Sequence, residues 1–229
     1  MGKHIRIAID GPSGAGKSTL AKMLAKEFSL IYVDTGALYR AVGYAAAQAG
    51  IDWRDSDLVT GLLPSLSVDL KYIGGEQRVL LNGEDISGLI RTPEISMAAS
   101  AVSAMPTVRA FLLGLQREIA AKNDVSMDGR DIGTVVLPDA GLKIFLSAAP
   151  EDRARRRFFE LQEKGDGSTY KEVLADMIKR DGDDSRREAA PLKKADGAVA
   201  VDTTGNSLEK SYGILRGIVQ NYIKREAAT

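Results

Sequence analysis

The pattern of apolar positions in the N-terminal part of the chain predicts strands and helices in alternation. Segments 5–9 and 31–33 are short runs of β-branched and aromatic residues, which is typical of buried strands. Apolar residues at helical spacing, or strong helix formers, follow each run, so 20–28 and 37–49 are predicted to be helical. The alternating order favours an α/β fold with a mainly parallel sheet flanked by helices.

The period of the pattern changes in the middle of the chain. At about 66–87, apolar and polar residues alternate, and glycine-containing turns at 74–75 and 82–83 interrupt the alternation. This pattern predicts a small three-stranded antiparallel insert in the α/β core. Helical patterns follow at 92–103 and 106–121.

Further strands and a last helix are predicted in the C-terminal part. The strands lie at 125–127, 143–146 and 198–201, and they extend the parallel sheet. Asn206 and Glu209 have the spacing of a capping box at the start of the last helix. An apolar stripe along that helix predicts that it packs on the sheet.

The segment at about 151–190 differs from the rest of the chain in its charge. It contains 10 basic and 11 acidic residues. Charged side chains are rarely buried without a partner, so this segment cannot be mostly core. We expect an exposed helical hairpin, or lid, between two strands of the sheet.

Composition narrows the classes of function. The chain has 229 residues, with 31 Lys plus Arg against 31 Asp plus Glu, so it carries no excess charge for a nucleic-acid or membrane surface. It has no cysteine and one histidine, which excludes thiolate nucleophiles and multi-histidine metal sites. No long apolar run or signal-peptide core is present, so a soluble, cytoplasmic protein is expected.

A complete Walker A loop joins the first predicted strand to the first predicted helix. It consists of Gly11, Pro12, Ser13, Gly14, Ala15, Gly16, Lys17, Ser18 and Thr19. The backbone N–H groups of such a loop and the helix start attract phosphate. Lys17 would reach the β- and γ-phosphates, and the Ser18 hydroxyl would bind Mg2+. The loop therefore predicts a site for a nucleoside triphosphate and its magnesium ion.

Two other classes of P-loop protein fit the sequence poorly. A GTPase has an Asn-Lys-x-Asp motif after an Asp-x-x-Gly switch, whereas here 193–196 lacks the asparagine and precedes 202–205. A motor-type ATPase needs a longer chain and sensor motifs that this sequence does not contain. Transfer of a phosphoryl group to a small acceptor fits better.

Arginines recur near the predicted carboxyl ends of strands, where ligands bind in parallel sheets. They are Arg40, Arg130, Arg180 and Arg187, with four more between 153 and 157. Donor and acceptor phosphates repel each other, so transfer between them needs cations that hold both in line. A guanidinium group suits this task because it binds phosphate oxygens in pairs and keeps its charge. The distribution favours phosphoryl transfer between two anions.

Five motifs together resemble the bacterial cytidylate kinase family. They are Gly-Pro-Ser-Gly-Ala-Gly-Lys-Ser-Thr (11–19), Asp-Thr-Gly-Ala-Leu-Tyr-Arg (34–40), Asp-Gly-Arg-Asp-Ile-Gly-Thr-Val-Val (128–136), Lys-Ile-Phe-Leu (143–146) and Arg-Asp-x-x-Asp-Ser-x-Arg (180–187). The resemblance implies a single P-loop kinase domain over 1–229. Within it, 35–121 would bind the nucleoside monophosphate and 151–190 would form the lid.

The resemblance also implies an activity and its ligands. ATP would phosphorylate CMP, and dCMP as a second acceptor, with Mg2+ as the cofactor. The family resemblance implies a monomer with small-molecule substrates. The balanced charge and the lack of targeting signals predict a cytoplasmic protein with no nucleic-acid or membrane partner.

Roles for individual residues follow from the same resemblance. The implied catalytic residues are Lys17, Arg130 and Arg180. The implied ligands of CMP are Thr35, Arg40, Arg130 and Arg180 for the phosphate, Ser100, Arg109 and Asp131 for the base, and Asp184 and Arg187 for the ribose. The implied ATP ligands outside the loop are Arg156 and Arg157, and Asp128 would hold Mg2+ through water.

Two alternatives remain open on the sequence alone. One is a P-loop kinase for another small acceptor, such as UMP, AMP or shikimate. The other is a regulatory protein that binds ATP without turnover, although arginines on several separate segments exceed what one nucleotide requires.

Overall fold

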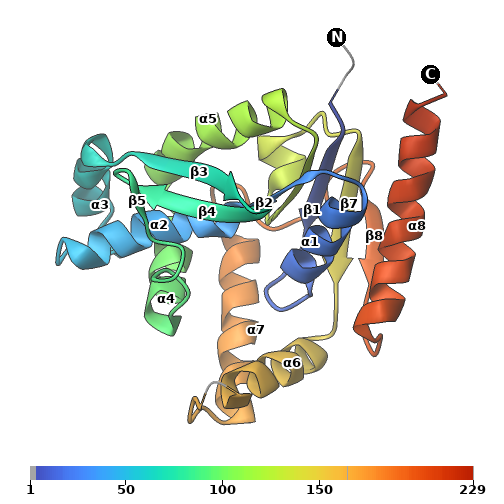
Figure 1. The fold of residues 1–229 in the computed structure, drawn as a ribbon. Helices are drawn as coiled ribbons and strands as arrows, with labels where there is room; N and C mark the ends of the chain where they lie inside the picture. Colours follow the sequence, from blue (N-terminus) through green and yellow to red (C-terminus); the bar gives the residue numbers. More distant parts are fainter. Residues whose placement is uncertain (1–3, 164, 229) are drawn as a thin grey trace. The chain divides into compact units, whose positions relative to one another are not determined.

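The structure, a computed structural model, describes residues 4–163 and 165–228 (Figure 1). The chain forms two compact units. The first unit contains Met1–Tyr32 and Asp124–Thr229, and the second contains Val33–Asn123. The second unit is therefore an insertion in the sequence of the first, and each unit is described by itself.

A five-stranded sheet forms the centre of the first unit, in the order β2-β6-β1-β7-β8. Its strands are β1 (Arg6–Asp10), β2 (Ile31–Asp34), β6 (Val125–Gly129), β7 (Leu142–Ser147) and β8 (Val199–Asp202). The pairs β1–β6, β1–β7 and β7–β8 are parallel. The loops that follow these four strands therefore leave from the same edge of the sheet, which is the usual ligand edge.

Two helices share the core on one face of this sheet. The helices of the first unit are α1 (Lys17–Glu27), α6 (Pro150–Glu163), α7 (Tyr170–Arg186) and α8 (Leu208–Glu226), with a π-helical turn at Ile132–Val136. α1 and α8 lie side by side (Figure 1). Leu24 of α1 and Leu215 of α8 pack with Ile7 of β1 and Ile144 of β7. Every second side chain of a strand points to the same face of the sheet, and these two isoleucines point to the face that the helices cover. Burial of these side chains fixes α1 and, with it, the loop that precedes it.

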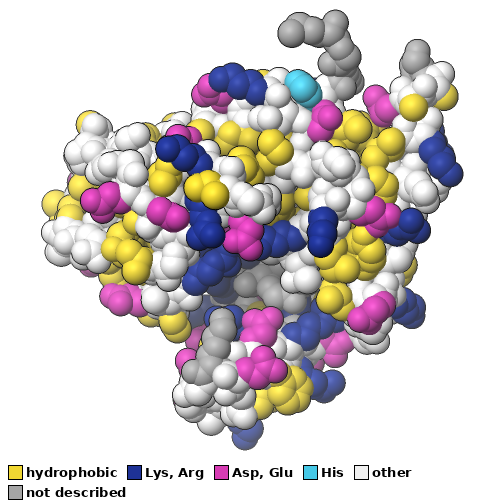
Figure 2. Space-filling view, viewed as in Figure 1, with side chains coloured by type: hydrophobic (Ala, Val, Ile, Leu, Met, Phe, Trp, Pro, Cys, Tyr) yellow, Lys and Arg dark blue, Asp and Glu magenta, His cyan; other side chains and the backbone are white. Residues whose placement is uncertain are grey.

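α6 and α7 pack together as a helical hairpin (Figure 1). Ala154, Val173 and Met177 form a small apolar cluster between them, and Phe158 and Tyr170 pack against it. Figure 2 shows basic and acidic side chains interspersed over the surface of the two helices, at the bottom of the view. The prediction of a charged helical hairpin is confirmed.

The second unit combines helices with the predicted antiparallel insert. Its elements are α2 (Thr35–Gln48), α3 (Ser56–Leu62), a 3-10 turn (Leu63–Ser65), β3 (Val68–Ile73), β4 (Glu76–Leu81), β5 (Glu84–Asp85), α4 (Pro93–Val102) and α5 (Pro106–Lys122). The strands form an antiparallel sheet in the order β3-β4-β5. α2 packs on α4 so closely that a side chain at Gly43 would meet Ala98 at 2.9 Å.

No single helix among the described residues is long and apolar enough to span a membrane. α4 and α5 reach that length and composition only as a pair, and the chain bends by 99° between them.

The predicted start of the last helix is wrong by one residue. Ser207 is the N-cap of α8, and its side chain accepts the N–H of Lys210. Asn206 instead donates its side-chain N–H to the carbonyl of Asp202. α3 is an element that the hydrophobic pattern does not predict. The other predicted strands and helices are confirmed to within a few residues.

Candidate active site

The Walker A loop follows β1 at the ligand edge of the sheet. Gly11 has φ 151°, and a Cβ there would lie 1.9 Å from the carbonyl oxygen of Leu146 on β7. Gly16, with φ 88°, is the N-cap of α1, and no side chain caps that helix end. The first turn of α1 also has no acidic residue. Its N–H groups are therefore available to a phosphate.

Gly11→Ala should destabilise the protein, because the new side chain would overlap a carbonyl of the neighbouring strand. We expect a loss of about 2 kcal/mol or more in the free energy of unfolding, and a melting temperature lower by roughly 5 °C. Gly217→Ala is the matched control, since Gly217 lies inside α8 with open space where its Cβ would be. The control should melt at the parent temperature or slightly above it. Equal melting temperatures for the two variants would contradict the close approach of the loop to β7.

Lys17 begins α1 and is 5 % exposed. Its Nζ donates to the carbonyl of Pro12 at 2.7 Å. Burial, together with the charge of Arg130, lowers the pKa of Lys17 to about 7, although the carboxylates of Asp128 and Asp10 act in the opposite direction. Two cations that disfavour each other's charge are characteristic of a site that binds an anion.

Ser18 and Asp128 provide neighbouring oxygens beside the loop. The Ser18 hydroxyl donates to Oδ2 of Asp128 at 2.9 Å. Asp128 is buried near the end of β6, where it pairs in register with Ile9 of β1. A hydroxyl and a carboxylate are ligands that Mg2+ prefers, and Mg2+ takes its remaining ligands from water and phosphates. The two residues fit a magnesium site of this kind, although the described residues contain no cluster of three or more His, Cys, Asp or Glu that could hold a metal alone.

A second cluster joins the loop after β6 to the end of α7. Nε of Arg130 donates to Oδ2 of Asp184 at 2.8 Å, and Nη1 of Arg187 lies 3.8 Å from Oδ1 of the same carboxylate. Burial would raise the pKa of Asp184, but the charges of Arg130, Arg187 and Arg180 outweigh it and leave the pKa below its ordinary value. The structure thus brings three of the predicted arginines together around the carboxylate of Asp184, which is itself a predicted residue.

This cluster lies within electrostatic reach of the loop. Arg130 lowers the pKa of Lys17, and Asp184 raises it. The three predicted catalytic residues, Lys17, Arg130 and Arg180, therefore act on one another either directly or through Asp184. Their arrangement can neutralise a transferred phosphoryl group.

Asp10 is a buried residue of the site that the sequence analysis missed. Its carboxylate accepts the N–H groups of Ile132 and Gly133, both at 2.7 Å. It thereby links the last residue of β1 to the turn that follows Arg130 and Asp131. Burial raises the pKa of Asp10 to about 6, although the two N–H groups act to lower it. The sequence signal that could have identified Asp10 is its place at the end of an apolar strand, where a carboxylate is rarely buried without a partner.

The run of four arginines on α6 divides into different environments. Arg153 is 3 % exposed, and it donates to the carbonyl of Ser13 at 2.9 Å and to Asp181 at 2.6 Å. Arg153 therefore connects the Walker A loop to both helices of the hairpin. Arg156 donates to the carbonyl of Thr203, whereas Arg157 pairs with Glu160 on the surface.

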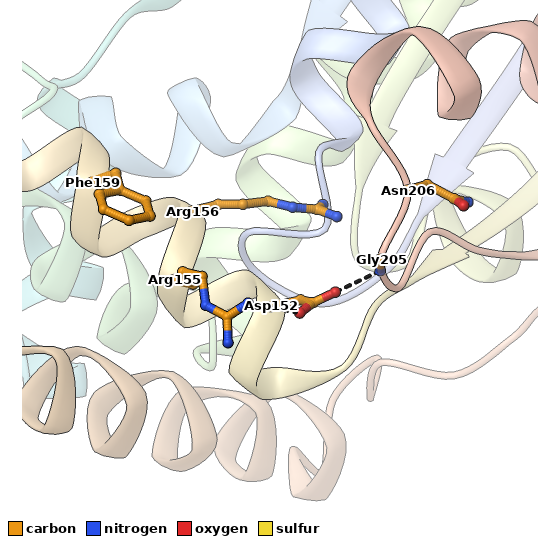
Figure 3. Close-up of a pocket in the computed structure, with 6 residues that line it drawn as sticks. All are labelled: Asp152, Arg155, Arg156, Phe159, Gly205 and Asn206. Atoms are coloured by element: carbon orange, nitrogen blue, oxygen red, sulfur yellow. Dashed lines mark hydrogen bonds and ion pairs between the residues drawn. The ribbon is translucent and has the colours of Figure 1, made fainter.

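A shallow pocket of about 230 Å³ lies beside α6. It is lined by Asp152, Arg155, Arg156, Phe159, Gly205 and Asn206. Figure 3 shows Arg156 extending from α6 across the pocket, and Asp152 bonded to the N–H of Gly205. Arg155 belongs to the arginine run that the sequence analysis singled out, whereas Phe159 is a residue that sequence reasoning did not assign to a site.

The predicted residues of the second unit lie on α2, α4 and α5. Asp34 is the N-cap of α2, and its carboxylate accepts the N–H of Ala37. A carboxylate thus accepts one N–H group of this helix start, and the binding of an anion at Thr35 stays a prediction. Two cations lie beside this carboxylate, Arg40 at 2.7 Å and the exposed Arg91 at 3.6 Å from Oδ2 of Asp34.

Arg109 and Ser100 occupy separate positions in this unit. The Arg109 guanidinium lies over the ring of Tyr39, 5.6 Å from its centre, and donates to the carbonyl of Ser103. The carbonyl of Ser100 accepts the hydroxyl of Ser103. Arg109 is thus held against α2, the helix that carries Arg40.

The parallel sheet, the Walker A loop at its ligand edge and the arginine–carboxylate cluster define a P-loop nucleotide-binding protein of the phosphotransferase type. The sequence model of the family "Cytidylate kinase" matches residues 7–221. The chain belongs to the cytidylate kinase family.

Relatives of similar length support this assignment. The chain is 47% identical over 216 residues to the cytidylate kinase of Lactobacillus johnsonii, with 94% of each chain covered. It is 49% identical over 217 residues to that of Carboxydothermus hydrogenoformans, covering 94% of this chain and 97% of the relative. A solved structure of an uncharacterized protein from Eubacterium ventriosum matches with a TM-score of 0.53 at 13% identity, over 95% of this chain and 99% of that one. That likeness concerns the fold alone.

Proposed function

We propose that the protein transfers the γ-phosphoryl group of ATP to CMP, and to dCMP, giving ADP and the nucleoside diphosphate. The observation that carries the proposal is the cluster of arginines around Asp184, which lies close enough to Lys17 of the Walker A loop for their charges to interact. A site for one nucleotide needs the loop, whereas transfer between two anions needs the additional arginines. Membership of the cytidylate kinase family supports the choice of acceptor.

The chemistry is a direct displacement. An oxygen of the acceptor phosphate forms a bond to the γ-phosphorus as the bond to the β,γ-bridging oxygen of ATP breaks, and ADP leaves. Lys17, Arg130 and Arg180 stabilise the charge that moves onto the bridging oxygen and the transferred group. No residue of the protein forms a covalent intermediate.

We assign magnesium to Ser18 and Asp128. The Ser18 hydroxyl would bind the ion directly, and Asp128 would hold one of its water molecules, as the 2.9 Å contact between the two side chains allows. When bound, the ion neutralises charge on the β- and γ-phosphates.

We assign the pocket on α6 to the nucleoside part of ATP. Arg153 ties the start of α6 to the Walker A loop, and neighbouring residues of the same helix line the pocket, which therefore lies near the bound phosphates. Arg156 and Phe159 offer a guanidinium group and an aromatic ring for stacking on a base. Arg157 does not line this pocket, and its role toward ATP stays a prediction.

The roles of the remaining residues toward CMP are assigned within each unit. In the first unit, Arg130 and Arg180 would bind the phosphate, Asp131 the base, and Asp184 with Arg187 the ribose. In the second unit, Thr35 and Arg40 would bind the phosphate, and Ser100 and Arg109 the base. The partly buried ion pairs of Arg130 and Arg40 support these roles, since each guanidinium is already oriented.

We further propose that the hairpin of α6 and α7 acts as a lid, and that the protein works as a cytoplasmic monomer in pyrimidine nucleotide metabolism. The position of Arg156 on α6 supports the first point, because movement of the hairpin would carry a cation toward or away from ATP. The balance of 31 basic and 31 acidic residues supports small-molecule substrates rather than nucleic acid or a membrane.

Initial rates with ATP against CMP, dCMP, UMP, AMP and shikimate test the proposal. We expect CMP and dCMP to be the fastest acceptors, with ADP release dependent on the acceptor. A faster rate with UMP, AMP or shikimate would identify a different kinase. ATP binding without acceptor-dependent ADP release would indicate a regulatory protein.

A further inference from the structure

Asp34 is the residue on which the start of α2 depends. It is 7 % exposed. One carboxylate oxygen accepts the N–H of Ala37 at 3.0 Å, and the other accepts from Nη2 of Arg40 at 2.7 Å. A single side chain thus caps the helix and sets the direction of the Arg40 guanidinium.

The backbone of Asp34 is held by a residue of the antiparallel insert. The N–H of Asp34 donates to Oε1 of Gln77 at 2.8 Å, and Nε2 of Gln77 donates to the carbonyl of Asp34 at 3.3 Å. Gln77 lies on β4, 43 residues away in sequence. Its primary amide provides one donor and one acceptor to the same residue, as a neighbouring strand would.

The contacts around Asp34 leave little room for adjustment. A Cβ at Gly36 would lie 3.2 Å from Oδ1 of Asp34 and 3.3 Å from Nη1 of Arg40. The pair of Asp34 and Arg40 therefore lies directly against the backbone of the first turn. A small shift of the Asp34 backbone would disturb the helix cap and the Arg40 pair together.

We propose that Gln77 is a positioning residue for acceptor binding, which acts by fixing Asp34 and, through it, Arg40 and Thr35. The antiparallel insert then has a function in the reaction, because it supports the turn that carries Arg40 and Thr35. This inference rests on the proposed function of Arg40 and Thr35 in binding CMP.

Gln77→Met tests the inference, since methionine has a similar length and no amide. We expect KM for CMP to rise roughly five- to tenfold, as the loss of about one oriented hydrogen bond predicts, with KM for ATP unchanged. Arg78→Met is the matched control, because Arg78 is the next residue of β4 and forms ion pairs with the exposed Glu76 and Asp85. The control should keep both KM values.

Gln77→Glu provides a graded variant if the methionine variant folds poorly. A carboxylate still accepts the N–H of Asp34 but donates nothing to its carbonyl, so KM for CMP should rise less than with methionine. A merely structural role would lower the melting temperature of both variants and leave the ratio of the two KM values unchanged. Unchanged KM for CMP in folded Gln77→Met, or an equal rise for CMP and ATP, would overturn the inference.

Arg40→Met separates this inference from the proposed function. If Arg40→Met raises KM for CMP and Gln77→Met does not, only the inference is overturned. If Arg40→Met leaves KM for CMP unchanged, the role of Arg40 is wrong and positioning through it is overturned as well. If both act, the double variant should bind CMP little worse than Arg40→Met alone, because Gln77 works mainly through Arg40.

Discussion

Lys17→Ala is expected to lower kcat/KM for CMP phosphorylation about 10²-fold or more, which corresponds to about 2.7 kcal/mol of transition-state stabilisation. The lysine lies at the start of α1, buried and close enough to Arg130 for the two charges to interact. Charge moves along the β- and γ-phosphates during transfer, so a fixed cation there acts more on the transition state than on bound ATP. Steady-state kinetics with ATP and CMP measure the effect.

The stability of the same variant gives an independent control. The pKa of Lys17 is lowered to about 7 from an ordinary 10.5, so the unfolded chain binds more protons than the folded protein between these values. The free energy of unfolding contributed by Lys17 therefore rises with pH across this window and is least favourable below pH 7. Removal of the amine should leave the nucleotide-free protein at least as stable at pH 7.

A second comparison excludes a general effect of changing a lysine on this helix. Lys26 is an exposed residue of α1, and Lys26→Ala should keep the parent activity. A folded Lys17→Ala protein that phosphorylates CMP at the parent rate would show that the Walker A loop is not the donor site.

The sequence predicts those elements of the fold whose apolar pattern depends on neighbouring residues alone. Alternation along 66–87, with its glycine-containing turns, predicts β3, β4 and β5 because successive side chains of a strand point to opposite faces of the sheet. The short helix α3 is different, because only Val59 of its residues is buried and no apolar stripe forms. The start of α8 was misplaced because Asn206 and Ser207 are both good N-caps, and the choice depends on the contact of Asn206 with Asp202.

The candidate site likewise contains parts that the sequence predicts and contacts that it does not. The Walker A loop is predictable because its glycines, lysine and serine are consecutive and their chemistry is local. The link from Gln77 to Asp34 is not, since it joins residues 43 positions apart through a backbone contact. The run of arginines on α6 also gives no local signal for Arg153. Only the packing of the helix decides that this guanidinium is buried against Ser13 and Asp181.

Asp131→Ala should narrow the preference for CMP over UMP by about tenfold to a hundredfold, since an unpaired polar group in a closed pocket costs roughly 1–3 kcal/mol. Cytosine presents an amino donor at N4, whereas uracil presents a carbonyl acceptor at the same position. A carboxylate accepts a hydrogen bond from the cytosine amino group and repels the carbonyl oxygen of uracil. Asp131 is 4 % exposed, and its backbone carbonyl accepts the N–H of Val135 at 2.9 Å, so its position is fixed by the turn that it begins.

The competing explanation is that Asp131 serves only to orient Arg130. In the structure Nε of Arg130 donates to Asp184, which already orients that guanidinium, and this favours a role for Asp131 toward the base. Asp131→Asn sharpens the test, because an amide can accept from cytosine and also donate to uracil, so kcat/KM for UMP should rise relative to CMP. Asp139→Ala removes an exposed carboxylate of the same unit and should leave the ratio unchanged. If Asp131→Ala lowers kcat/KM for CMP and UMP by the same factor, Asp131 supports the phosphate site and another residue recognises the base.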